Sequence, residues 1–260
     1  MTSIVLPFLL SMFLGRTIDL TTYTVGGDIY DHQDYIETPL NITSTRYYVF
    51  QDNTYPYPTM GIPVDIVLRI KGNYLSSTSG IMGLDGVLKD TIWKYDSVMV
   101  AIFTVIQTTR RDLKPDASLV SNWTDRLEDT QTHYVNSIIY GGWNAIFLRL
   151  KCDLPGDIEA VRKTLASVLG VTGQVGPEIV ELWKEAIEKI EKDEFIRGKV
   201  RVGVQTYSTT PLTYVDLTVE NILEIISEFP KKVGELGQPL YVELKPLHEL
   251  DPKFPAVQEN

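Results

Sequence analysis

The chain of 260 residues carries 24 Lys and Arg against 34 Asp and Glu, and its net charge of −10 opposes long-range attraction to nucleic acid. An apolar fraction of 43% and a charged fraction of 22% are those of a folded protein, so extensive disorder is excluded. The single cysteine, Cys152, excludes an intrachain disulfide and is expected to be a small buried apolar side chain.

The first apolar run, residues 4–14, is expected to form a buried element. It is not expected to be a signal peptide, because no basic residue precedes it and no small-x-small cleavage site follows it. The least periodic stretch, residues 30–60, predicts a surface loop. Residues 63–71 alternate apolar and polar side chains, which predicts a strand with one buried face.

Two further strands are predicted in the centre of the chain. Residues 98–106 are apolar on both faces, which is typical of a strand covered from both sides. Residues 134–152 form a long strand with Gly141-Gly142 at its middle. Two consecutive glycines weaken a strand, because they lose backbone entropy on folding and offer no side chain to pack. A sharp bend of the sheet, where larger side chains would collide, would account for them.

Helices are predicted in the next part of the chain. Asp157 is a candidate cap for a helix that ends at Gly170, and Pro177 is placed to open a second helix. Their apolar stripes recur at three- and four-residue spacing. They comprise Ile158, Val161, Leu165 and Val168, then Ile179, Leu182, Ala186 and Ile190.

The last predicted elements are a strand, a helix and a strand. Residues 199–207 alternate apolar and polar side chains, which predicts a strand. A helix is expected from Thr218 as its cap to about Phe229, with Pro230 stopping it. A short strand follows at residues 240–244.

One motif resembles a family signature. The triplet Thr132-His133-Tyr134, followed after six residues by Gly141-Gly142, is similar to the signature of the membrane attack complex/perforin and cholesterol-dependent cytolysin (MACPF/CDC) superfamily. Leu14-Gly15-Arg16 resembles the opening of the stonustoxin-like fish-venom toxins. Residues 98–115, 132–150 and 239–247 resemble three strands of the same domain.

The resemblance implies an α+β fold over residues 1–260 as a single domain, with a bent, twisted, four-stranded antiparallel central sheet flanked by two helical clusters. These clusters would be the inserts 72–95 and 155–192, which in this family refold into membrane-spanning hairpins. A spanning strand needs about 9–11 residues, with alternate side chains facing lipid. The candidate membrane-inserting residues are Met82, Leu84, Leu88 and Ile92 in the first insert, and Leu165, Leu169, Val171 and Val175 in the second.

The function expected from this resemblance is pore formation. The protein would oligomerise on a lipid membrane and insert β-hairpins, either with its own copies or with a partner subunit that supplies what further toxin domains contribute. The alternative is a non-lytic interaction or regulatory module on the same scaffold, because fold does not fix function. Secretion and a cytoplasmic location both stay open.

No catalytic residue, cofactor or metal site is expected, and the protein is not expected to be an enzyme. The three histidines, His32, His133 and His248, have no ligand spacing between them, so a structural hydrogen bond is the expected role of His133.

Overall fold

The computed structural model forms two compact units that share three long strands. Unit 1 comprises residues 1–42, 107–141 and 235–260, and unit 2 comprises residues 43–106 and 142–234. The residues described are 4–8, 11–31, 34–49, 97–127, 130–170, 172–174, 178–210 and 221–254. The strand predicted at residues 63–71 and the first insert, 72–95, lie outside them.

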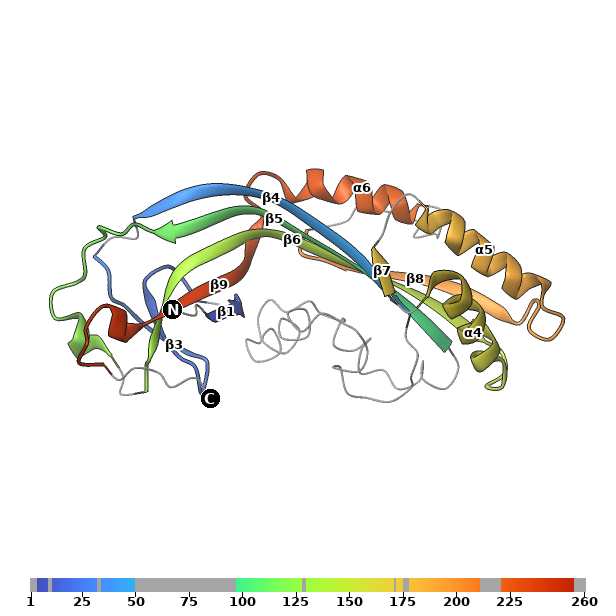
Figure 1. Cartoon of the computed structure of the whole chain (residues 1–260), viewed down its shortest axis with the longest axis horizontal. Helices are drawn as coiled ribbons and strands as arrows, with labels where there is room; N and C mark the ends of the chain where they lie inside the picture. Colours follow the sequence, from blue (N-terminus) through green and yellow to red (C-terminus); the bar gives the residue numbers. More distant parts are fainter. Residues whose placement is uncertain are drawn as a thin grey trace. The chain divides into compact units, whose positions relative to one another are not determined.

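The described residues contain one nine-stranded sheet of order β1-β9-β6-β5-β4-β7, in which β2 pairs with β6 and β3, and β8 pairs with β6 (Figure 1). The pairs β1–β9, β2–β3, β2–β6, β4–β7, β6–β8 and β6–β9 are all antiparallel. The expected four strands are therefore not the whole sheet, although β8, β6, β5 and β4 are successive neighbours in it. The strands are Ile4–Pro7 (β1), Arg16–Asp19 (β2), Thr24–Asp28 (β3), Tyr35–Val49 (β4), Ser97–Leu113 (β5), His133–Cys152 (β6), Thr172–Gln174 (β7), Val200–Ser208 (β8) and Gln238–Pro246 (β9).

The long strand β6 changes its neighbour at the glycine pair. Its first part, His133 to Gly141, pairs with β9, and its second part, Asn144 to Cys152, pairs with β8. Gly142 and Trp143 lie between the two ladders. There the side-chain hydroxyl of Thr209 accepts a hydrogen bond from the Trp143 N–H at 3.0 Å, so a backbone donor at the change of partner is satisfied locally.

The core of unit 2 lies between the sheet and three helices, α4 (Asp157–Leu169), α5 (Ile179–Lys192) and α6 (Ile222–Val233). Figure 1 shows α5 and α6 along the same side of β6 and β8. The sequence predicted strand β5 correctly, and its residues 97–104 are buried on both faces. The apolar stripes of α4 and α5 point into this core, as expected from their helical spacing.

The core of unit 1 is built from the N-terminal segment and the strands β6 and β9. The first apolar run is not uniformly buried, because it forms the short strand β1 and then a turn. Met12 and Leu14 are buried, whereas Val5 and Phe13 are exposed. Two short 3-10 helices, Trp123–Arg126 and Leu247–Glu249, complete the described elements of this unit.

The loop predicted for residues 30–60 is wrong in its described part, where β4 covers Tyr35–Val49. The pattern was misleading because residues 35–39 and 41–44 are exposed on both faces of the strand, the apolar Ile36 and Ile42 included, so burial does not sort apolar from polar side chains there. An apolar–polar alternation arises only when one face is buried. Near its end β4 does enter the core, through Tyr47 and Val49.

Two helix boundaries also differ from the prediction. Gly156, and not Asp157, is the N-cap of α4, and it makes no side-chain capping bond. Pro230 does not stop α6, which continues to Val233 with the proline exposed inside it. The extra turn buries Val233 against Phe229 and Ile106, and this burial offsets the hydrogen bond that the proline cannot donate.

Candidate functional site

The signature triplet lies at the start of β6 in unit 1, where His133 is 3% exposed. Its Nδ1 is 2.8 Å from the hydroxyl of the preceding Thr132, so the expected structural hydrogen bond of His133 is present. Burial lowers the pKa of His133, and the nearby imidazole of His248 lowers it further. The Leu247 N–H donates to the Thr132 carbonyl at 2.9 Å, so His133 and His248 lie on neighbouring segments, although 115 positions separate them in the sequence.

The third residue of the triplet, Tyr134, packs on Tyr30 with ring centroids 6.0 Å apart. Burial raises the pKa of both phenols, because the charged form is disfavoured away from water. The pair belongs to the core of unit 1, and the raised pKa values favour the protonated form of both hydroxyls. Thr132, His133 and Tyr134 thus have packing and hydrogen-bonding roles.

Gly142 is a point of close approach in unit 2. A Cβ added there would lie 2.5 Å from Val233 Cγ2 and 3.2 Å from Phe229 Cζ, both on α6. These distances are too short for a side chain, so glycine lets the last turns of α6 lie directly on the strand. The absence of a side chain at Gly142 is therefore explained by helix packing.

Gly141 is a point of close approach in unit 1. A Cβ added at Gly237 would lie 2.6 Å from the carbonyl carbon of Gly141, and Gly237 has a positive φ of 74°. Its neighbours Leu236 and Glu235 accept hydrogen bonds from the hydroxyls of Thr108 and Thr109 on β5. The predicted bend at Gly141-Gly142 concerns how one unit sits against the other, and it remains a prediction.

The second insert, residues 155–192, contains α4, β7 and α5 and connects β6 to β8 in unit 2. Its candidate residues Leu165 and Leu169 are buried on α4, at 0% and 5% exposure. They face the sheet core and not solvent. Val171 and Val175 lie outside the described residues, as do Met82, Leu84, Leu88 and Ile92 of the first insert.

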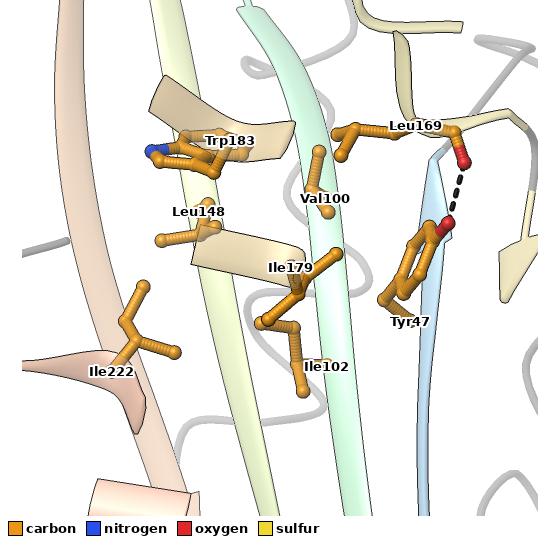
Figure 2. A pocket seen from close by; sticks show the side chains of 8 residues that line it. All are labelled: Tyr47, Val100, Ile102, Leu148, Leu169, Ile179, Trp183 and Ile222. Atoms are coloured by element: carbon orange, nitrogen blue, oxygen red, sulfur yellow. Dashed lines mark hydrogen bonds between the residues drawn. The ribbon is translucent and has the colours of Figure 1, made fainter. Parts of the chain in front are cut away.

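A small apolar cavity of about 20 Å³ lies between this insert and the sheet. Figure 2 shows Val100, Ile102 and Leu148 of the sheet on one side of it and Ile179 and Trp183 of α5 on the other. The indole N–H of Trp183 is buried and has no hydrogen-bond partner in the described part of the chain. The contact between helices and sheet is thus neither completely filled nor completely satisfied.

Tyr47 connects the insert to the edge of the sheet. Its hydroxyl donates a 2.5 Å hydrogen bond to the carbonyl of Leu169, at the C-terminus of α4 (Figure 2). A Cβ added at Gly173 of β7 would lie 2.7 Å from the Tyr47 ring, so glycine at this position lets β7 pack directly against the phenol ring. Through β7 the insert covers part of the outer edge of β4, at residues 46–48.

Sequence reasoning missed the three residues that hold these contacts, Tyr47, Gly173 and Gly237. The first two lie in or beside segments with little periodicity. Gly237 was visible only as one of two glycines after a helix, and the partners of all three are remote in the sequence. No local pattern predicts such contacts.

Among the described residues no cluster of three or more His, Cys, Asp or Glu side chains could hold a metal ion. In that same part of the chain, every helix is too short or too polar to cross a bilayer. Cys152 is buried, as expected.

The fold is thus an antiparallel sheet whose neighbouring strands β6 and β8 are connected by a helical insert packed on one face. The chain is similar to the solved structure of stonustoxin, with a TM-score of 0.47 and 10% identity over 95% of this chain and 32% of that chain. It is also similar to the cytotoxin suilysin from Streptococcus suis, with a TM-score of 0.41 and 11% identity over 95% of this chain and 61% of that chain.

A third similar structure is astrotactin-2, described as a vertebrate-specific, perforin-like membrane protein. Its TM-score is 0.38, with 13% identity over 97% of this chain and 43% of that chain. The chain therefore spans less than two thirds of each of these three structures. No family model and no curated protein matches the sequence. With TM-scores below 0.5, these similarities leave the function to be inferred from the chain's own geometry.

Proposed function

We propose that the protein is a MACPF/CDC-like pore-forming protein, which assembles on a membrane and inserts β-hairpins from residues 72–95 and 155–192. The supporting observation is the connection between β6 and β8. These strands pair antiparallel over nine positions, from Asn144↔Ser208 to Cys152↔Val200, and the helical insert leaves and returns at the same end. An extended insert would therefore continue an existing ladder.

The connection between β6 and β8 is long enough to form a membrane-spanning hairpin. There are 47 residues between Cys152 and Val200, and two spanning strands with a turn need roughly 20–25 residues. Leu165 and Leu169 share a face at helical spacing, and they also share a face at the two-residue period of a strand. The same side chains can thus face the sheet core in the folded insert and lipid in an extended one.

The way the insert is held is compatible with release. It contacts the sheet through apolar side chains, a three-residue strand and the Tyr47–Leu169 hydrogen bond, with an unfilled cavity beneath it. Removing β7 would uncover backbone donors and acceptors of β4, and an uncovered strand edge pairs readily with another chain. A closed barrel needs such pairing between copies, because no backbone group can stay unpaired in lipid.

Dye release from liposomes tests this proposal. We expect leakage together with ring-sized oligomers in negative-stain images. A disulfide between Arg46→Cys and Gln174→Cys, which are opposite each other in the β4–β7 pair, should block leakage until reductant is added. As the control, a disulfide between Asn144→Cys and Ser208→Cys joins β6 to β8, which stay paired in both states, and should leave leakage unchanged.

A second function is favoured by one observation on α5. Its exposed face carries three ion pairs at helical spacing, Lys184–Glu181, Lys189–Glu185 and Lys192–Glu188, which support the helix against refolding. On this evidence the scaffold would serve as a non-lytic interaction or regulatory module. Absence of both leakage and oligomers across all lipid compositions would decide for this second function.

A further inference from the structure

Two large apolar side chains are exposed where the second insert leaves and rejoins the sheet. Leu154 follows β6 and is 54% exposed, and Phe195 precedes β8 and is 78% exposed. The N–H of Asp153 donates to the carbonyl of Lys199 at 2.9 Å, so the two connections begin side by side. Single exposed apolar residues are ordinary on a protein surface, but these two bracket the segment that would insert.

The exposure of Phe195 is imposed by an ordered turn. The Phe195 N–H donates to the Asp193 carboxylate at 2.9 Å, and Lys199 Nζ donates to the Phe195 carbonyl at 2.5 Å. The next residue, Ile196, is 1% exposed and anchors the turn in the core of unit 2. The turn therefore holds the Phe195 ring in water instead of letting it fold back onto the core.

Charges around these two residues are nearly balanced. Seven cationic and six acidic residues lie within six positions of one or the other. The cationic residues are Arg149, Lys151, Lys189, Lys192, Arg197, Lys199 and Arg201, and the acidic residues are Asp153, Asp157, Glu159, Glu191, Asp193 and Glu194. Asp153 is paired with Arg201 at 2.7 Å, and Asp193 accepts the bond from the turn. This end is close to neutral in a chain of net charge −10.

We propose that this tip, defined as Leu154, Phe195, Lys151, Arg197, Lys199 and Arg201, is the site of first contact with a bilayer of zwitterionic phospholipid. Phe195 and Leu154 enter the boundary between headgroups and acyl chains, where aromatic side chains are favoured, and the cations contact headgroup phosphates. The negative charge of the whole chain makes an anionic surface a poorer target than a zwitterionic one. The inference rests on the proposed function, since contact at the tip brings both ends of the second insert to the membrane.

A fluorescent label tests the contact directly. In a Phe195→Cys variant labelled with an environment-sensitive dye, phosphatidylcholine vesicles should blue-shift and brighten the emission. The control is the same dye on Val5→Cys in unit 1, where the native side chain is 55% exposed and no change is expected. Cys152 is buried, and wild-type protein treated with the same dye checks that Cys152 is not labelled.

Vesicle sedimentation tests the residues. The double variant Leu154→Ser/Phe195→Ser should bind phosphatidylcholine vesicles at least about tenfold more weakly, because it lacks the two exposed apolar side chains that enter the bilayer. Its matched control, Ile36→Ser/Ile42→Ser, replaces two side chains on β4 that are each 49% exposed, and should change binding less than about twofold. Replacing part of the lipid with phosphatidylserine should weaken the binding of all variants.

Three results would overturn the inference: a silent label at position 195 on vesicles, equal loss of binding in the control variant, or stronger binding to anionic vesicles. Leakage separates this inference from the proposed function. A shift at position 195 without leakage supports tip contact and counts against pore formation, whereas leakage with a silent label refutes tip contact alone.

Discussion

Tyr47 and Leu169 are joined by a hydrogen bond from a phenol on the β4 edge of the sheet to the last carbonyl of helix α4, although 122 positions separate them in the sequence. Helix C-termini leave carbonyls without partners inside the helix, and here a side chain of the sheet supplies one. The bond therefore satisfies α4 and fixes the insert to β4 at the same time.

The first prediction concerns this bond. Tyr47→Phe should lower the free energy of unfolding by about 1–2 kcal/mol, because a buried carbonyl loses its donor. It should also speed dye release, since the insert is held less firmly. Urea denaturation and leakage rates measure the two effects. Tyr23→Phe, at an exposed position in unit 1, should change neither; slower leakage from Tyr47→Phe would contradict the proposed role.

The second prediction concerns the packing of α6 on the sheet. Gly142→Ala should destabilise the protein by about 1–3 kcal/mol, because the new methyl group would overlap Val233. Adding Val233→Ala should restore part of that loss, so a double-mutant cycle should show coupling between the two positions. Gly203→Ala on β8, where nothing lies within 4 Å of the added carbon, should be nearly neutral. Purely additive effects of Gly142→Ala and Val233→Ala would show that the clash is not what requires glycine.

The third prediction concerns the cavity in Figure 2. Val100→Ile adds one methylene to a residue that lines it and should raise the free energy of unfolding by up to about 0.8 kcal/mol. The filled contact should also slow leakage. Val98→Ile, in the same core but not lining the cavity, should instead be neutral or destabilising. If both substitutions destabilise equally, the cavity does not accept a side chain.

The fourth prediction concerns pH. Because burial holds the pKa of His133 below its unfolded value of about 6.5, the unfolded chain binds the proton more readily. This contribution to stability is complete above about pH 6.5 and is lost as the pH falls from there towards the folded pKa, with a slope of at most about 1.4 kcal/mol per pH unit. Denaturation between pH 7.5 and about 5 measures it, and His133→Gln should flatten the curve. An unchanged curve in that variant would show that His133 does not cause the slope.

The sequence predicts an element well when the element's own side chains determine it, and poorly when contacts with distant residues do. Strand β5 is predictable because its own side chains are apolar on both faces, and α5 because Ile179, Ala186 and Ile190 repeat at the helical period. Strand β4 is missed because much of it is exposed on both sides. The end of α6 is missed because the burial of Val233, a tertiary contact, outweighs the local signal of Pro230.

At the candidate site, the contacts of the glycine pair Gly141-Gly142 with distant residues also could not be predicted from the sequence. The sequence indicates that positions 141 and 142 need small residues, and the close packing of α6 explains the need at Gly142. It does not reveal the neighbours, which are Val233 and Phe229 of α6 at Gly142, and Gly237 at the backbone of Gly141. Those partners follow more than eighty residues later, beyond the reach of any spacing rule.

The three-residue strand β7 has a consequence for handling the protein. Variants that lack residues 172–174 would leave residues 46–48 of β4 without their neighbouring strand. Unpaired strand edges promote aggregation, so such variants should precipitate when they are concentrated. Loss of solubility on truncation should therefore not be mistaken for loss of the fold.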